Sequence, residues 1–324
     1  MKVILHIGYP KTATSTLQDV LLHNLDKSRY NFIGRSSFSD AKEKEILDFF
    51  YNRSNKFNNF SLFDKNRINI ISEEMLSLVI CISEEGEYLK VEKLVKRMKI
   101  FFNKIEEYYN EKIELEVIIT VRAQKTLLES LYVELFPWCF RLKYDFNTPE
   151  KFINSINNKL HEDLFKSFNF KYIIDTYRKH LTKNIKLICY EDLLYKKEDF
   201  FNDISTFFYI NNKDFVRKAF EKKVNVKNMK KDKYLVNVNL SYYIAKFIYA
   251  TKLINLYFKL RHVSAVKNTI KTIFSGLSRI RVKNYEIRKF SEYEKNKIYQ
   301  FYKNDNKHLQ EFIDIKKLEK YGYV

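Results

Sequence analysis

The chain has 324 residues, a hydrophobic fraction of 45% and a formal net charge of +19, from 59 Lys and Arg residues against 40 Asp and Glu residues. With only 5 Gly and 3 Pro, the composition excludes collagen-like and low-complexity architectures and long flexible linkers. The charge favours anionic partners (nucleotides, charged glycans, nucleic acid or anionic lipid) without choosing among them. Three cysteines, Cys81, Cys139 and Cys189, lack the spacing of a zinc site or a disulfide framework, so we expect a reducing, cytoplasmic compartment.

Apolar runs along the chain predict strands that alternate with helices. The run KVILHI at 2–7 predicts a strand that ends at Gly8, and it is too short for a signal peptide or a membrane-spanning helix. The spacing at 14–25 predicts a helix directly after the loop. Further strands are predicted at 68–71, 115–121 and 185–190, and helices at 88–109, at 123–134 and from about Met75, with Ser72 as the N-cap of the last.

This alternation predicts an α/β fold with a central parallel sheet flanked by helices in three layers, and a helix-rich C-terminal half. We expect a single domain over 1–324 with a basic helical segment at about 241–280. In such folds ligands bind beyond the carboxyl ends of the strands. Polar residues follow the predicted strands at 8–16, at 72–74 and at Arg122.

The loop from Gly8 to Thr16 joins the first strand to the first helix and carries the strongest chemical signal. Backbone N–H groups at a helix start favour an anion, and Lys11 and the hydroxyls that follow it add a charge and donors. The ATP-binding pattern G-x-x-x-x-G-K-[ST] is not met, because two residues separate Gly8 from Lys11 and no glycine precedes the lysine. The loop therefore predicts a phosphate site of another kind.

The sequence HIGYPKTATSTLQ resembles the 5′-phosphosulfate-binding loop of the PAPS-dependent sulfotransferases, in particular the bacterial glycan-modifying branch. The resemblance implies a P-loop-like fold, 3′-phosphoadenosine 5′-phosphosulfate (PAPS) as donor, 3′,5′-ADP as product and no metal. It implies donor contacts from Gly8, Lys11, Thr12, Ala13, Thr14, Ser15 and Thr16. Ala13 stands where the family commonly has glycine; alanine keeps its N–H group, but a positive φ there would be costly.

The family also places an arginine at a strand end and a serine eight residues later on the 3′-phosphate. Here VIITVRAQKTLLESLY has Arg122 and Ser130 at that spacing. The resemblance extends to LICYEDLL at 187–194, where we expect Glu191 to be structural, and to the final KYGYV. The segment at 223–234 resembles a basic loop near the nucleotide, with Asn225, Lys227 and Lys230 as candidate contacts or as part of a solvated charge run.

The implied reaction is attack of an acceptor hydroxyl or amine on sulfur. Lys11 would stabilise charge on the departing oxygen. Among Glu73, Glu74 and the histidines, the family's S-S-E pattern selects Glu74 as the base, although acids in a first helical turn also favour the helix dipole. The acceptor class suggested by the resemblance is a cell-surface polysaccharide or its lipid-linked precursor. The aromatic cluster Phe136, Trp138 and Phe140 fits core packing better than sugar stacking.

Two other functions stay open. One is an ATP-dependent small-molecule kinase, and the other is a nonenzymatic module that binds a polyanion or a membrane surface. No nucleic-acid-binding motif is found in the sequence, so we expect no nucleic acid partner. The segment at 241–280 predicts core-facing helices, with peripheral binding to an anionic membrane, at the cytoplasmic face of an inner membrane, as the alternative.

Overall fold

The computed structural model describes residues 1–34, 41–52, 54–77, 90–142, 148–158, 162–221, 229–230, 233–250 and 264–324. They form two compact units. The first comprises Met1–Leu127, Lys159–Val224 and Tyr299–Val324, and the second Leu128–Asn158 and Asn225–Ile298. Helices α3 (Gln124–Leu142) and α13 (Glu292–Asn306) each have residues in both units. The single domain expected over 1–324 stays a prediction.

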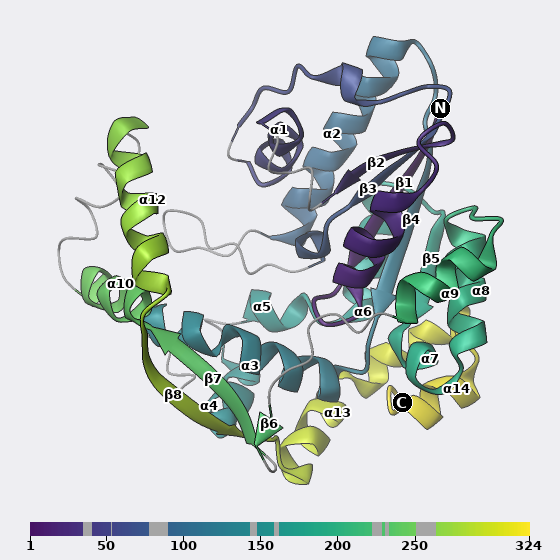
Figure 1. Cartoon of the computed structure of the whole chain (residues 1–324). Coiled ribbons are helices and arrows are strands. Elements are labelled where there is room, and N and C mark those ends of the chain that lie inside the picture. Colours follow the sequence, from purple (N-terminus) through teal and green to yellow (C-terminus); the bar gives the residue numbers. More distant parts are fainter. Residues whose placement is uncertain are drawn as a thin grey trace. The chain divides into compact units, whose positions relative to one another are not determined.

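A five-stranded parallel sheet in the order β2-β3-β1-β4-β5 forms the centre of the first unit (Figure 1). The strands are β1 (Lys2–Gly8), β2 (Tyr30–Gly34), β3 (Ile68–Ser72), β4 (Glu114–Val121) and β5 (Ile185–Cys189). This confirms the predicted α/β class, with a parallel sheet flanked by helices. Because β1 lies between β3 and β4, with His6 opposite Ser72 and Gly8 opposite Thr120, the ends of three strands meet at one edge.

Helices cover both faces of this sheet. Those of the first unit, besides parts of α3 and α13, are η1 (Thr16–Leu21), η2 (Leu22–Asn24), α1 (Ala41–Phe50), η4 (Phe60–Leu62), η5 (Glu74–Leu76), α2 (Val91–Tyr109), α5 (Glu162–Lys166), α6 (Phe170–His180), α7 (Tyr190–Tyr195), α8 (Lys197–Phe207), α9 (Lys213–Glu221), η8 (Lys307–Glu311) and α14 (Ile315–Tyr321). Helices α1, α2 and α6 pack in sequence on one side, and α9 packs on η1 (Figure 1). No helix in the described ranges has the length and hydropathy needed to span a bilayer.

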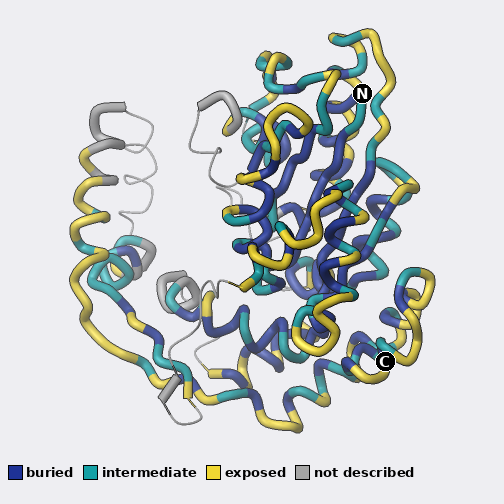
Figure 2. The backbone as a smooth tube through the Cα atoms, turned by 45° about the vertical axis from the view of Figure 1, so that its right-hand side comes forward, coloured by how far each residue is buried: buried dark blue, intermediate teal, exposed yellow. Residues whose placement is uncertain are grey.

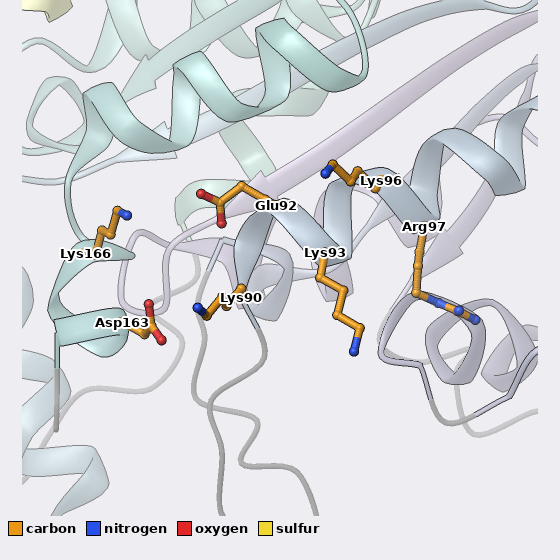
Figure 3. A pocket seen from close by; sticks show the side chains of 7 residues that line it. All are labelled: Lys90, Glu92, Lys93, Lys96, Arg97, Asp163 and Lys166. Atoms are coloured by element: carbon orange, nitrogen blue, oxygen red, sulfur yellow. The ribbon is translucent and has the colours of Figure 1, made fainter.

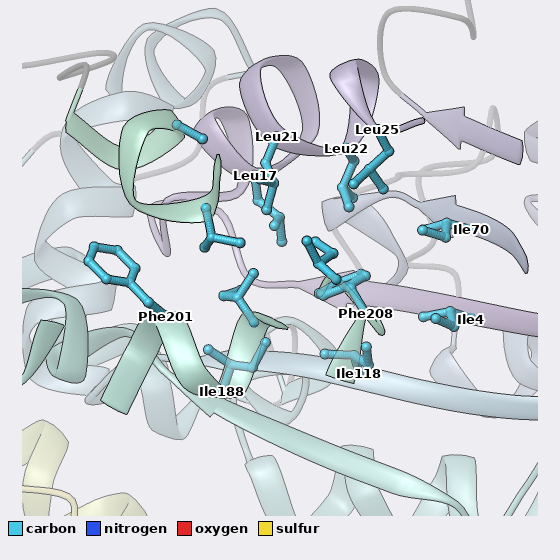
Figure 4. Packing of buried hydrophobic residues seen from close by; sticks show 14 of the residues in the cluster. Ile4, Leu17, Leu21, Leu22, Leu25, Ile70, Ile118, Ile188, Phe201 and Phe208 are labelled. Carbon is cyan, nitrogen blue, oxygen red and sulfur yellow. The ribbon is translucent and has the colours of Figure 1, made fainter. Parts of the chain in front are cut away.

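The core on the η1 side is built by alternation along the strands. Ile4, Ile70, Ile118 and Ile188, one from each of four strands, project to the same face and pack with the helical run after β1 and with α8 and α9 (Figure 4). Burial of one such side chain contributes about 1.5–3 kcal/mol, so the helix that follows the Gly8–Thr16 loop is firmly held on the sheet.

One charged residue is buried within the largely apolar run that forms β4. Glu116 of β4 is only 2% exposed and pairs with Lys186 at 2.6 Å and Lys2 at 3.0 Å, and it accepts a hydrogen bond from Tyr209. Burial alone would raise the pKa of Glu116, but the hydrogen bonds from these three partners lower it overall. The carboxylate is therefore charged and compensated within the fold.

The second unit contains a three-stranded antiparallel sheet that we did not predict, in the order β6-β7-β8 (Figure 1). Its strands are β6 (Met229–Lys230), β7 (Lys233–Asn239) and β8 (Arg281–Arg288). The other elements wholly within this unit are α4 (Pro149–Asn154), η6 (Ser155–Asn157), α10 (Leu240–Ala250) and α12 (Ser264–Ser278). The basic helical segment expected at 241–280 thus corresponds to α10 and α12, with residues 251–263 outside the described ranges.

The helix predicted at 14–25 is present. Thr14 and Ser15 are helical, Thr16–Leu21 forms a π-helix and Leu22–Asn24 a 3₁₀ turn. The prediction of a helix from about Met75 with Ser72 as its N-cap was wrong at its start, because Glu74–Leu76 form the 3₁₀ turn η5 and the Ser72 hydroxyl faces the ring of His6 inside the sheet. Residues 78–89 lie outside the described ranges.

An acidic cluster lies where α14 packs near α7 and α8. Asp192 is buried and accepts from Tyr321 at 2.7 Å and from Lys317 at 3.1 Å, while Lys317 also pairs with Asp199 at 2.9 Å. Asp203 lies near these charges, and its burial, together with the charge of Asp192, raises its pKa to about 6.

We expect Asp203→Asn to stabilise the fold at pH 7.5 and not at pH 4. Because the folded pKa lies above the usual 3.8, the folded state binds the proton more tightly, and the contribution of Asp203 to stability falls as pH rises from about 4 to 6. Allowing for partial exposure, the gain at pH 7.5 is about 1–2 kcal/mol. Thermal unfolding at both pH values measures this gain.

Asp199→Asn is the matched control. It should destabilise the fold at pH 7.5, because Lys317 lowers the pKa of Asp199. Equal effects of the two variants would contradict the prediction.

Candidate functional site

The loop after β1 turns twice through the left-handed region of backbone conformation. Lys11 has φ +69° and Ala13 φ +63°, and the helical run begins at Thr14. Left-handed residues alternating with right-handed ones turn successive N–H groups towards a common concavity that suits an anion. The N–H groups at the start of the helix lack intrahelical partners and favour the same ligand. The local backbone thus has the form of an anion site.

The two small residues of the loop, Gly8 and Ala13, differ in what their positions demand. Gly8 does not need a positive φ, but a Cβ there would lie 2.3 Å from Cγ2 of Thr14, so the glycine permits close approach of the helix start. The positive φ falls on Ala13, where it costs about 1–2 kcal/mol for a residue with a side chain. Ala13 therefore does not have the negative φ that would have made the replacement of glycine by alanine free of strain.

Side chains of the loop alternate between inward and outward positions. Thr12, Thr14 and Thr16 are buried, whereas Lys11, Ala13 and Ser15 are half-buried. Thr12 Oγ1 donates to the carbonyl oxygen of Tyr9 at 2.6 Å. Two of the hydroxyl groups that we expected on a phosphate, those of Thr12 and Thr14, thus donate their protons within the protein. Lys11 and Ser15 remain the side chains placed at the accessible side of the loop.

Tyr9 anchors the loop in the core of the first unit. Its side chain is fully buried, its hydroxyl donates to the carbonyl oxygen of Ser167 at 2.6 Å, and its ring packs against Phe168 and Phe170. Its backbone N–H donates to Thr120 of β4 at 3.2 Å. The anchor fixes the first residues of the loop before the backbone enters the strained turns.

Glu74 reaches the loop from the end of β3. Thr14 Oγ1 donates to Glu74 Oε2 at 2.5 Å. The segment that carries Glu74 is attached to β1 at two points, because the N–H of Glu73 donates to the His6 carbonyl at 3.1 Å and Ser77 Oγ donates to the Gly8 carbonyl at 2.9 Å. The candidate base and the candidate phosphate loop are therefore neighbours, although sequence places them 60 residues apart.

Arg122 reaches the same loop from the end of β4. Its Nη1 donates to the carbonyl oxygen of Lys11 at 2.8 Å, its Nε donates to Thr126 Oγ1 at 3.0 Å, and the guanidinium lies 4.7 Å from the ring centroid of Tyr190. A planar guanidinium held on two sides keeps a defined orientation, which suits recognition of a phosphate. Lys11, Glu74 and Arg122 are thus gathered at one edge of the sheet.

A polar layer lies beneath the loop, inside the sheet. His6 is fully buried, with Nδ1 2.7 Å from Ser72 Oγ and Nε2 3.0 Å from Thr120 Oγ1. Gln18, from the helix after the loop, donates to Ser72 Oγ at 3.0 Å. Burial lowers the pKa of His6 to about 3, so the ring is neutral at neutral pH. His6 therefore joins strands to helix and is unsuited to act as a base exposed to substrate.

Glu191 takes the structural position expected for it. It is 5% exposed and accepts from the backbone N–H of Ala123 at 3.0 Å and from the hydroxyl of Tyr323 at 2.8 Å. Burial raises the pKa of Glu191. The contacts join the YED motif to the C-terminal KYGYV motif and fix the residue next to Arg122.

Several candidate residues are not brought to the loop by the described structure. Ser130 is half-buried on α3 and belongs to the second unit, so its pairing with Arg122 on one phosphate stays a prediction. Asn225 and Lys227 lie outside the described residues, as do the side chains of Lys230, Trp138 and Phe140. Phe136 is buried and packs against Tyr285, which fits core packing.

A basic pocket of about 400 Å³ lies in the first unit (Figure 3). It is lined by Lys90, Glu92, Lys93, Lys96, Arg97, Asp163 and Lys166. Helix α2 runs from β3 back to β4, so its N-terminal end, with Lys90 and Lys93, lies towards the carboxyl edge of the parallel sheet. Arg97 has a structural role, because its guanidinium donates to the carbonyl oxygens of Phe49 and Ser54. The pocket could not be predicted from the sequence, because its lining residues come from two helices that are distant along the chain.

We expect Ala13→Gly to raise the free energy of unfolding by about 0.5–1 kcal/mol. The change removes about 1–2 kcal/mol of left-handed strain, and the greater backbone freedom of glycine in the unfolded chain offsets about half of it. Urea unfolding followed by circular dichroism measures the difference. The control Ala219→Gly, at a buried position in α9, should instead lose about 1 kcal/mol or more. A loss at position 13 as large as the control's would mean that the loop has no left-handed strain.

Comparison with known proteins finds similarity only at the level of structure. No protein-family model and no curated protein matches the sequence. A sulfotransferase from Alicyclobacillus acidocaldarius matches with a TM-score of 0.40 and 14% identity, over 71% of this chain and 86% of that one. Mouse sulfotransferase SULT7A1, solved in complex with PAP, matches with a TM-score of 0.37 and 14% identity, over 93% of this chain and 89% of that one. The structure is thus similar to those of two sulfotransferases.

Proposed function

We propose that the protein transfers a sulfuryl group from PAPS to a hydroxyl or amine of an acceptor, with release of 3′,5′-ADP. The observation that carries the proposal is the meeting of Lys11, Glu74 and Arg122 around the strained loop at the carboxyl edge of the sheet. A loop of backbone donors, a point charge, a carboxylate and an oriented guanidinium are the groups that such a transfer requires. A cytoplasmic location stays an expectation.

The loop and Arg122 suit the two phosphate groups of the donor. Left-handed turns at Lys11 and Ala13 present backbone N–H groups to the 5′-phosphosulfate, and Lys11 and Ser15 lie on the accessible side. Nη1 and Nε of Arg122 bind protein atoms, so we assign Nη2 to the 3′-phosphate, with Ser130 as its predicted partner. We also assign Lys227, from the basic loop, to the donor.

The proposed chemistry is an in-line displacement at sulfur. The acceptor oxygen or nitrogen forms a bond to sulfur while the bond between sulfur and the bridging oxygen breaks, and that oxygen leaves with the electron pair as part of 3′,5′-ADP. Lys11 and the loop N–H groups stabilise the charge that develops on the leaving oxygen. Glu74 takes the proton of the acceptor, and the hydrogen bond from Thr14 orients its carboxylate beside the loop.

We further propose that the acceptor is a glycan with anionic groups, such as a bacterial cell-surface polysaccharide or its precursor. The pocket at the N-terminal end of α2 has four lysines against two carboxylates, in addition to Arg97. Glu92 is held by Tyr172 and by nearby lysines: burial alone would raise its pKa, but the hydrogen bond from Tyr172 and these charges lower it overall. The remaining positive potential favours carboxylate, sulfate or phosphate groups over neutral sugars.

The kinase alternative fits the loop less well. In an ATP site, the Ser or Thr after the loop lysine binds magnesium through its hydroxyl. The residue at that place is Thr12, which is 2% exposed and donates its hydroxyl proton to the Tyr9 carbonyl within the loop. Magnesium ATP would require this contact to open.

We expect 3′,5′-ADP to raise the melting temperature of the protein, and ADP or magnesium ATP to raise it much less. At a hundred times its dissociation constant a ligand adds about 2.7 kcal/mol to stability. Arg122→Ala should weaken 3′,5′-ADP binding roughly 10- to 100-fold, the loss of one charge-assisted hydrogen bond of about 1.5–3 kcal/mol. Titration by thermal shift or calorimetry measures both effects.

Arg217→Ala is the matched control for this titration. Arg217 is exposed on α9, and its side chain pairs with Glu198 and Asp214, neither of which is a candidate site residue, so its loss should leave nucleotide affinity unchanged. Equal loss in the two arginine variants would remove Arg122 from the site. A larger response to magnesium ATP than to 3′,5′-ADP would replace the sulfotransferase proposal with the kinase.

Glu74→Gln should lower kcat for sulfuryl transfer about 100-fold or more while 3′,5′-ADP affinity stays within about twofold. The assay transfers ³⁵S from PAPS to a panel of uronate-containing and neutral oligosaccharides. Thr14→Val separates the two roles of the carboxylate, because it removes the same hydrogen bond and keeps the base. A drop in kcat that is as large in Thr14→Val at saturating PAPS would mean that Glu74 only holds the loop.

A further inference from the structure

The positive charge of the chain is concentrated in one stretch of the second unit. From Lys233 to Tyr285 the sequence contains ten Lys and Arg residues and no Asp or Glu, whereas the whole chain has 40 acids. This stretch lies within Asn225–Ile298 and supplies ten of the nineteen formal net charges. Codon bias towards lysine does not explain a local absence of acids, so the stretch has a charge character of its own.

The described part of this stretch exposes large apolar side chains. Phe247 on α10 is 62% exposed and Ile273 on α12 is 53% exposed. Ile280, just before β8, and Val282, in β8, are 50% and 48% exposed. Figure 2 shows the exposed backbone continuing from α12 into β8. Exposed aliphatic residues that follow one another along an element indicate a surface that is covered in use.

Cations and apolar residues alternate where α12 gives way to β8. Arg279, Ile280, Arg281, Val282 and Lys283 follow one another, and all five are exposed. Val282 is the extra residue of a β-bulge, because Arg281 pairs with Asn239 and Lys283 with Val238. A bulge turns side chains out of the regular pleat on an edge strand. We call these five residues the 279–283 surface.

Protection of an edge strand does not account for this surface. Lysine and arginine on an edge strand prevent pairing with other chains, but exposed isoleucine and valine beside them promote association. The combination therefore indicates a partner that accepts positive charge and aliphatic side chains together.

We propose that the 279–283 surface, with Phe247 and Ile273 on the adjoining helices, docks the second unit on an anionic lipid bilayer. A second copy of the chain would bring two cationic faces together, and a soluble polyanion would leave the aliphatic groups in water. At a bilayer, the arginines and Lys283 meet lipid phosphates while Ile280 and Val282 enter the boundary of the acyl chains. In this proposal the protein binds peripherally, at the surface of the membrane.

Co-sedimentation of the full-length protein with lipid vesicles tests the proposal. Vesicles contain either phosphatidylcholine alone or phosphatidylcholine with about one-third phosphatidylglycerol. We expect binding to the anionic vesicles only. The variant Arg279→Gln/Arg281→Gln/Lys283→Gln should lose roughly 100-fold in partition coefficient, about fivefold for each charge. The variant Ile280→Ser/Val282→Ser should lose at least about tenfold with its charge unchanged.

The matched control removes three exposed lysines from the first unit, in Lys99→Gln/Lys179→Gln/Lys218→Gln. Its partition should change by less than about threefold, since these residues do not belong to the surface. Circular dichroism and the 3′,5′-ADP response confirm that each variant is folded. Equal loss in control and surface variants would overturn the proposal in favour of net charge alone. Full binding by Ile280→Ser/Val282→Ser, with displacement by soluble heparin, would overturn it in favour of a soluble polyanion, and a dimer abolished by that variant would do so in favour of a second copy.

Discussion

The hydrogen bond from Arg122 to the carbonyl oxygen of Lys11 joins the ends of two strands into one site. The backbone bond from Tyr9 to Thr120 links the start of the loop to β4, and the Arg122 bond adds a link at Lys11, further along the loop. The bond length of 2.8 Å depends on the position of β4's last residues, and these are fixed because Glu191 accepts from the N–H of Ala123. Glu191 in turn is held by Tyr323, next to the last residue of the chain. The carboxyl end of the chain therefore determines how the loop near its amino end is oriented.

The fold tolerates the strain in the loop because contacts on both sides of the loop hold its backbone in place. Left-handed Lys11 and Ala13 cost about 1–2 kcal/mol each, a large share of the usual margin of about 5–15 kcal/mol. On one side the buried Tyr9 fixes the entry to the loop, and on the other the π-helix after Thr16 is packed into the core by Leu17 and Leu21. Strained backbone and π-helical turns both concentrate at functional sites, and here they are consecutive.

Sequence predicted the parts of the fold that are set by long apolar runs. Four of the five parallel strands were found to within a residue or two, because strands buried on both faces are continuous in hydrophobicity. β2 was missed, since YNFIG is short and lies at the sheet edge, and so was the β7–β8 pair, whose exposed face is rich in lysine and arginine. The burial of Glu116 could not be predicted, because its three partners, Lys2, Lys186 and Tyr209, come from distant segments.

For the candidate site, sequence predicted residues but not their orientations. Motif spacing selected Lys11, Arg122 and Glu74, yet it could not show that Glu74 meets Thr14 or that Arg122 meets the loop carbonyl, since both contacts join segments at least 60 residues apart. Hydroxyl groups were expected to face the phosphate, and those of Thr12 and Thr14 donate inward instead. The left-handed turns decide in which direction these side chains point. An alanine in the sequence does not indicate a left-handed turn, so this could not be predicted. Because these hydroxyl protons are donated within the fold, the proposed anion binding by the loop relies mainly on its backbone N–H groups. Backbone donors keep their place whatever side chain they carry, which is why a loop with alanine at position 13 can keep the geometry of an anion site at the cost of local strain.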